Sequence, residues 1–190
     1  MSKFFINLIV IEKYLLWFEN VDITLTNSTD SFASFGLFYS NLLYLDIPME
    51  KNLIAKSSII INVPVAKVWD ALVNPTVIKQ YMFGTEVVSD WKENSPIVWK
   101  GIWNEKPYED KGTILKLIPE KTLQYTHFSA LSGATDIPEN YHTLTYELSG
   151  VGGHTEVSLS QDNNSSEEDL KHSQQMWDSM LDGLKKLLES

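Results

Sequence analysis

The alternation of apolar and polar positions near residue 60 predicts a strand followed by two short helices. The β-branched run 59–61 favours a strand, and it ends before Pro64, whose fixed φ suits the first turn of a helix. Apolar residues then recur at helical spacing over 65–73. Asn74-Pro75 breaks this helix and can cap a second one that carries Ile78. The chain therefore opens with strand, helix, helix.

After these helices the apolar pattern changes to one typical of strands. Turn residues, including Asp110-Lys111-Gly112 and the glycine-rich run 150–153, separate short segments rich in strand-forming residues. Short links between them predict an antiparallel meander. The predicted strands are 85–90, 96–103, 112–118, 122–130, 141–149 and 154–161.

Two of these strands alternate clearly enough to assign their faces. Leu144, Tyr146 and Leu148 alternate with Thr143, Thr145 and Glu147, and Val157 and Leu159 alternate with polar neighbours in the same way. One face of the sheet is therefore expected to be buried and the other solvated. The loop 132–140 is long for a hairpin and contains Gly133 and Pro138, which predicts a flexible flap.

The last segment is predicted to be a long amphipathic helix. Ser165 with Glu168, or Ser166 with Asp169, has the spacing of a capping box, and acidic side chains suit a helix N-terminus. Burying each large apolar side chain contributes about 1.5–3 kcal/mol before entropy is subtracted, so this helix is expected to pack on the sheet. Its apolar stripe is Trp177, Met180, Leu181, Leu184, Leu187 and Leu188.

This order of elements resembles the helix-grip fold of the START and birch-pollen-allergen-like superfamily. Segments 63–75 and 78–81 are similar to the opening signature of the family named after the C-terminal domain of the activator of heat-shock protein 90 ATPase. Further matches follow in order at 99–101, 111–114, 118–126, 145–148, 154–159 and 177–189. The resemblance covers roughly 53–190. It implies an α+β fold in which a curved antiparallel sheet of about seven strands wraps around a long C-terminal helix, with two short helices after the first strand.

Composition narrows the function classes. The chain has 190 residues and 43% hydrophobic content, which is enough for one ordinary domain with a core. All 15 basic residues are lysine and the net charge is −10, which disfavours nucleic acid as a partner and excludes guanidinium clamps on anions. The absence of cysteine excludes disulfides, thiolate nucleophiles and cysteine-ligated metals. We expect a cytoplasmic protein.

The first 48 residues lack a sustained apolar period. The apolar run 4–10 is interrupted by Glu12 and Lys13, well short of the roughly 20 residues that a membrane-spanning helix needs. We interpret 1–48 as an N-terminal extension that is either translated leader or poorly ordered, the alternative being a membrane-seeking or partner-binding segment. We expect 49–190 to form the START-like domain and to fold without it.

A curved sheet closed by a long helix leaves a cavity, and concave apolar sites are where small ligands usually bind. Tryptophan, tyrosine and histidine side chains can hold an amphipathic ligand by satisfying its polar groups, and simple core packing is the alternative role for each of them. The residues expected to line this cavity are Trp99, Trp103, Leu123, Tyr125, His127, His142, Leu144, Tyr146, Trp177, Met180 and Leu181.

No pattern of catalytic or metal-ligating residues accompanies these candidates. His127 and His142 lie on neighbouring predicted strands and could approach each other, but no spacing supplies a third metal ligand. We interpret Glu105, Glu109 and Asp110 as part of a solvated acidic face. We therefore expect no cofactor, no metal and no catalytic residues.

Three hypotheses of function follow. The first is non-enzymatic binding of a small, neutral, hydrophobic molecule between the sheet and the C-terminal helix, with the flap as a gate. The second, implied by the resemblance, is regulation of the heat-shock protein 90 ATPase as a co-chaperone. The third is an enzyme of cyclase or hydrolase type that acts on a hydrophobic substrate.

Overall fold

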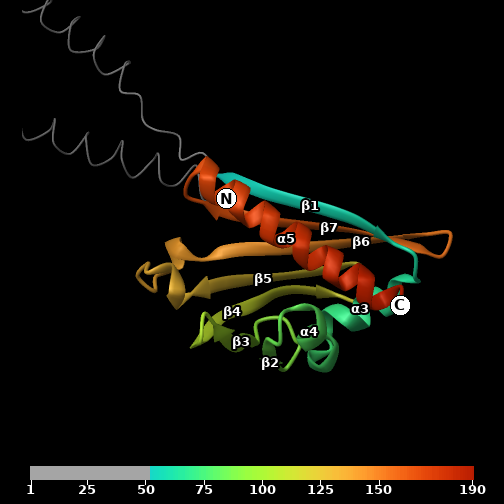
Figure 1. Ribbon diagram of the computed structural model, residues 1–190, viewed down its shortest axis with the longest axis horizontal. Coiled ribbons are helices and arrows are strands. Elements are labelled where there is room, and N and C mark those ends of the chain that lie inside the picture. Colours follow the sequence, from blue (N-terminus) through green and yellow to red (C-terminus); the bar gives the residue numbers. More distant parts are fainter. Residues whose placement is uncertain (1–51) are drawn as a thin grey trace, which may run out of the picture. The chain divides into compact units, whose positions relative to one another are not determined.

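Seven antiparallel strands form one sheet in the computed structural model, which describes residues 52–190 (Figure 1). The expectations for 1–48 lie outside the described residues. The strands are β1 (Leu53–Ile61), β2 (Glu86–Ser89), β3 (Pro96–Trp103), β4 (Lys106–Ile118), β5 (Thr122–Ser129), β6 (His142–Val151) and β7 (His154–Asn164). The helices are α3 (Val65–Val73), α4 (Pro75–Tyr81) and α5 (Glu167–Leu188), with short 3-10 turns at Ala130–Ser132 and Pro138–Asn140.

The sheet order is β1-β7-β6-β5-β4-β3-β2. Strands β2 to β7 form the predicted meander, while β1 pairs with β7 and so lies at the opposite edge from β2. The two short helices α3 and α4 therefore carry the chain from one edge of the sheet to the other. Figure 1 shows α5 lying across one face of the sheet, with α3 and α4 beside its C-terminal half. The α+β helix-grip architecture expected from the sequence is confirmed.

Helix α5 begins at the second of the two possible caps. The Ser166 hydroxyl accepts a hydrogen bond from the Asp169 backbone N–H at 3.0 Å and donates to the Asp169 carboxylate at 2.8 Å. Hydrogen bonds from Ser165 and Ser166 lower the pKa of Asp169. From this start the apolar stripe faces the sheet: Trp177, Met180, Leu181 and Leu184 are buried, and Leu187 and Leu188 are half-buried.

A buried polar network holds the first half of α5 against the sheet edge. The Trp177 indole N–H donates to the Gln161 side-chain oxygen at 2.8 Å, and the Gln161 amide donates to Asn164 and Ser173 at 3.0 Å each. The Asn164 amide donates to the Leu53 carbonyl at 2.8 Å. Because every bond is made inside the core, the network fixes the position of α5 relative to β1 and β7.

The assigned strand faces are also confirmed. Leu144, Tyr146 and Leu148 of β6 are buried, as are Val157 and Leu159 of β7. Register places Leu144 opposite Tyr125 and Tyr146 opposite Leu123. The buried residues of these strands therefore gather on the face that α5 covers.

The predicted turn at 110–112 is wrong. Strand β4 begins at Lys106, and the actual turn is Asn104-Glu105, where both residues have positive φ, 47° and 63°. Two central residues of this kind make the type I′ turn whose twist suits a hairpin. Gly112 lies inside β4, where a Cβ would sit 1.6 Å from the Thr126 carbonyl oxygen. Gly112 is therefore not a turn residue. It allows β4 and β5 to approach each other closely.

Candidate functional site

A small cavity lies inside the grip, between the two short helices and the inner face of the sheet. Its volume is about 20 Å³, which is room for a single water molecule. Four of the residues predicted to line a cavity do so: Trp99, Leu123, Tyr125 and Tyr146. The remaining lining residues are Leu72, Ile78, Tyr81, Met82, Trp91 and Ile97. Leu72, Ile78, Tyr81 and Met82 were missed because the opening helices were not assigned to the cavity wall, and Trp91 and Ile97 add the β2–β3 loop and β3 to that wall.

Three buried phenols make this wall neutral but polar. Burial raises the pKa of Tyr146 to about 12, and burial together with the neighbouring Tyr146 raises the pKa of Tyr81 and Tyr125 well above the ordinary value. The Tyr81 hydroxyl donates to the Ala71 carbonyl at 3.2 Å. All three phenols therefore stay protonated at neutral pH.

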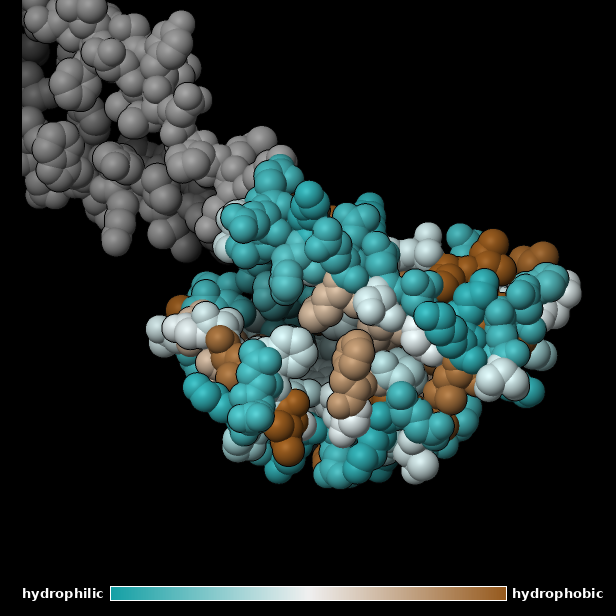
Figure 2. All heavy atoms as spheres, viewed as in Figure 1, coloured by the Kyte–Doolittle hydropathy of each residue, from teal (hydrophilic) through white to brown (hydrophobic). Residues whose placement is uncertain are grey.

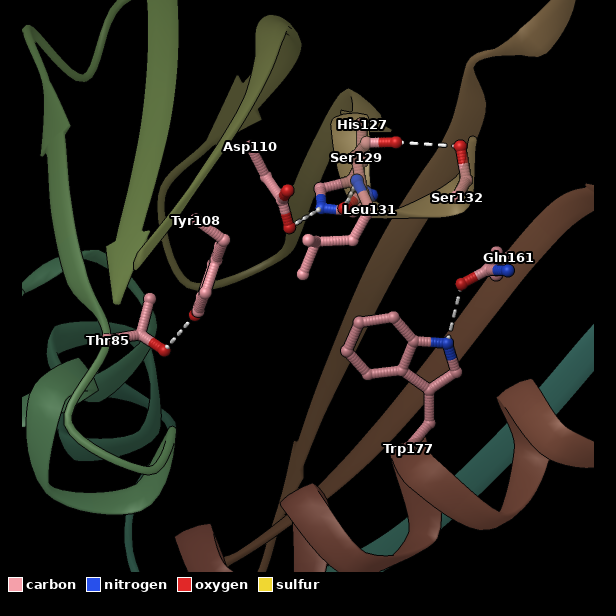
Figure 3. Close-up of polar contacts among 9 residues, drawn as sticks. All are labelled: Thr85, Tyr108, Asp110, His127, Ser129, Leu131, Ser132, Gln161 and Trp177. Carbon is pink, nitrogen blue, oxygen red and sulfur yellow. Dashed lines mark hydrogen bonds and ion pairs between the residues drawn. The ribbon is translucent and has the colours of Figure 1, made fainter. Parts of the chain in front are cut away.

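Beside this cavity a polar pair is set into the inner face of the sheet (Figure 3). The carboxylate oxygen Oδ2 of Asp110, on β4, lies 3.2 Å from Nε2 of His127, on β5. The two side chains are 14% and 23% exposed, respectively. The other carboxylate oxygen, Oδ1, is buried and finds no hydrogen-bond partner among residues 52–190. The Trp99 ring, which also lines the cavity, meets the His127 ring edge-on at 5.2 Å.

The face that carries this pair is hollowed. Figure 2 shows a depression between α5 and the strands β4 and β5. In the close-up of Figure 3, Asp110, His127 and Leu131 lie together above the space that separates Tyr108 from Trp177. Leu131 is largely exposed, and the Tyr108 hydroxyl is held by Thr85 at 2.8 Å. A part of the inner wall is thus left uncovered by α5.

The other predicted site residues take different places. Leu144, Met180 and Leu181 are fully buried in the core, and Trp177 is buried with its N–H bonded to Gln161. The placement of Trp103 in the cavity is wrong, because this side chain is 60% exposed at the tip of the β3–β4 hairpin, where no helix or strand covers it.

The two histidines of the flap region are neighbours, as the sequence allowed. His127 and His142 are register partners on β5 and β6. The His142 ring nitrogen Nδ1 donates to the Asp162 carbonyl at 2.9 Å, which orients this ring. Within 52–190 no group of three side chains could hold a metal ion.

Asp110 is the functional candidate that sequence reasoning missed. The acidic residues Glu105 and Glu109 are exposed, as expected, and Glu109 pairs with Lys100 at 3.0 Å. Asp110 departs from them because β4 starts earlier than predicted and turns this side chain inward. The alternation of Tyr108, Asp110, Gly112 and Ile114 is the signal that would have revealed it.

The loop 132–140 lies over one end of the sheet and is tethered at two points. Asp136 pairs with Lys111 and accepts a hydrogen bond from the Tyr141 hydroxyl at 2.8 Å. The Asn163 amide donates to the Glu139 carbonyl, also at 2.8 Å. The hydrogen bond and charge of Lys111 lower the pKa of Asp136. The flexibility of this flap stays a prediction, and these exposed tethers are what opening would break.

A larger depression, of about 410 Å³, lies on the solvated face of the sheet. It contains none of the predicted ligand-binding residues. Its lining comes from β1, β6 and β7 and is mostly hydroxyl-bearing or charged: Lys56, Ser57, Ser58, Thr145, Glu147, Ser158, Leu159 and Ser160.

The sheet order, the two short helices and the long C-terminal helix define an α+β protein of the START-like helix-grip class. The chain belongs to the family described as Activator of Hsp90 ATPase homolog 1-like protein, whose sequence profile matches residues 62–189. No curated protein sequence matches the chain. Across 52–190 no helix is long and apolar enough to span a membrane.

Solved structures share the fold. The solution structure of ChR145 from Cytophaga hutchinsonii is 58% identical, with a TM-score of 0.67, and the match covers 74% of this chain and 97% of that chain. The Aha1 dimer from Colwellia psychrerythraea is 23% identical, with a TM-score of 0.56 over 72% of this chain and 96% of that one. CalU16 from Micromonospora echinospora is 19% identical, with a TM-score of 0.55 over 72% and 82%. The latter two show likeness of fold alone.

Proposed function

We propose that this protein binds a small, neutral, hydrophobic molecule in the hollow between the sheet and α5, without changing it chemically. The observation that carries the proposal is the uncovered inner wall, where the half-buried Asp110 and His127 lie beside the Trp99 ring. Polar side chains set into a largely apolar inner face at the edge of a hollow are the kind of groups that orient a small ligand.

The ligand lies in the open hollow, with the small inner cavity behind it. Ligand pockets usually enclose about 300–1,000 Å³, whereas the inner cavity holds about 20 Å³. We therefore propose that Leu131 and the flap 132–140 close over the ligand from outside. Release of the Lys111–Asp136 pair would open this cover, since both partners are exposed and exposed ion pairs contribute little to stability.

Charge argues for a neutral ligand. The chain carries a net charge of −10 and has no arginine, so an anionic ligand would lack the partners needed to offset its desolvation. The buried phenols Tyr81, Tyr125 and Tyr146 are protonated and can offer hydroxyl groups but no charge. The cytoplasmic location expected from the sequence stays part of this proposal.

The test is titration with a neutral hydrophobic dye, Nile red, read by its fluorescence and by the melting temperature of the protein. We expect the melting temperature to rise with the logarithm of dye concentration. Tyr125→Ala and His127→Ala should each weaken binding roughly tenfold, which corresponds to about 1.4 kcal/mol.

The matched control is Thr145→Val, on the opposite face of the sheet. It should leave dye binding unchanged. Loss of binding in Thr145→Val with no loss in the other two variants would place the dye in the solvated depression lined by Thr145 and contradict the proposal.

A second candidate is a regulator that docks on the heat-shock protein 90 chaperone. Its support is the family description and two exposed apolar side chains: Phe83, after α4, is 79% exposed, and Ile102, beside Trp103 at the end of β3, is 74% exposed. If this candidate is correct, the protein changes the ATPase rate of its own organism's chaperone, and Trp103→Ser reduces that effect while Tyr125→Ala preserves it. An unchanged ATPase rate with the wild-type protein would exclude this function.

A further inference from the structure

We propose that Asp110 and His127 select ligands that carry a hydrogen-bond donor, a hydroxyl or N–H group, and that Nδ1 of His127 is the acceptor. This inference rests on the proposed binding function and adds the chemical class of the ligand. It starts from the Asp110–His127 pair on the uncovered part of the inner wall.

Asp110 fixes which nitrogen of His127 carries the proton. A carboxylate only accepts hydrogen bonds, so Nε2, 3.2 Å from Oδ2, must be the nitrogen that donates. In a neutral imidazole the second nitrogen, Nδ1, is then an acceptor. Residues 52–190 give Nδ1 no hydrogen-bond partner, and this nitrogen is accessible to solvent. An oriented acceptor is therefore available on a ring that is partly exposed.

Stability alone does not account for this pair. Within 52–190, Oδ1 of Asp110 is buried without a hydrogen-bond partner, and leaving a buried polar atom unsatisfied destabilises a fold, more so when the atom is charged. A single hydrogen bond to a neutral imidazole replaces only part of the hydration that a partly buried carboxylate loses. A buried polar atom without a partner at the edge of a concave site indicates a role in binding or chemistry.

The surroundings define the rest of the ligand. The Trp99 ring stands edge-on to His127, and Leu131 extends over the same space in Figure 3. Trp99 is nearly buried and supports the His127 ring from behind, whereas Leu131 is 54% exposed and supplies apolar surface at the opening. The ligand is accordingly an apolar molecule, aromatic or aliphatic, that ends in a single hydroxyl or N–H group placed against His127.

The experiment compares two probes of nearly equal shape, 2-naphthol, which has a donor, and 2-methoxynaphthalene, which lacks one. Binding is measured by calorimetry on the full chain. We expect the wild type to bind 2-naphthol about three- to tenfold more tightly, the usual net worth of one neutral hydrogen bond. His127→Phe should keep affinity for 2-methoxynaphthalene and lose the preference. Asp110→Asn, which keeps the size of the side chain but frees the choice of tautomer, should reduce the preference while the fold is retained.

The control is His154→Phe, a change at an exposed histidine beside the β6–β7 turn, which should leave both affinities unaltered. Equal binding of the two probes by the wild type, or an undiminished preference in both His127→Phe and Asp110→Asn, would overturn the inference while leaving the binding function in place. If neither probe binds and Nile red also fails, the binding function itself is wrong and the inference falls with it.

Discussion

Replacing Trp177 with alanine is expected to lower the free energy of unfolding by about 3–5 kcal/mol, the usual range for truncating a buried aromatic side chain. Trp177 is buried in the stripe of α5 that faces the sheet. Its N–H donates to Gln161 at 2.8 Å, so the change also leaves a buried amide oxygen without its partner. Denaturant unfolding of the wild type and the variant measures the difference in free energy of unfolding, provided that both curves have the same slope m.

Two further variants separate packing from hydrogen bonding at this position. Trp177→Phe keeps most of the buried surface but removes the N–H, so its loss should be smaller, about 1–3 kcal/mol. Met176→Ala, one residue earlier on an exposed part of the helix, should cost less than about 1 kcal/mol. If Trp177→Ala were as mild as Met176→Ala, the assigned face of α5 would be incorrect.

Gly112→Ala is expected to destabilise the fold by more than about 3 kcal/mol, beyond the usual range for overpacking. The added Cβ would lie 1.6 Å from the Thr126 carbonyl oxygen, which is backbone and cannot rotate away. Strand β4 would have to separate from β5 at the point where Asp110 and His127 face each other. Thermal and denaturant unfolding would both register the loss, and Nile red binding should weaken with it.

Gly150→Ala supplies the matched control. This glycine is also in a strand, β6, but a Cβ there would meet Val65 at 3.4 Å, near ordinary van der Waals contact. The substitution should change stability by less than about 1 kcal/mol. Equal effects of the two glycine changes would mean that β4 and β5 can separate freely, and that the close approach at Gly112 has no structural importance.

The sequence determined most of the fold because local signals agreed with one another. Proline after the first strand, the period of two in β6 and β7 and the apolar stripe of α5 each predicted one element, and short links left only an antiparallel meander. The same periodicity assigned Tyr125, Tyr146 and Trp177 to the interior correctly. Where two signals competed the prediction failed: Asp110-Lys111-Gly112 has the composition of a turn, but pairing with both neighbouring strands keeps β4 extended through it.

Only the tertiary structure decided what the interior contains. The inward direction of a side chain does not reveal whether another element covers it. Trp103 was therefore assigned to the cavity, although it lies at the end of the β3–β4 hairpin and is 60% exposed. The pairing of Asp110 with His127 depends on the register of β4 against β5, which residues far apart in the chain set together. The size of the inner cavity depends on how α3, α4 and α5 pack against the sheet, and a sum of such contacts across the whole core cannot be read from local spacing.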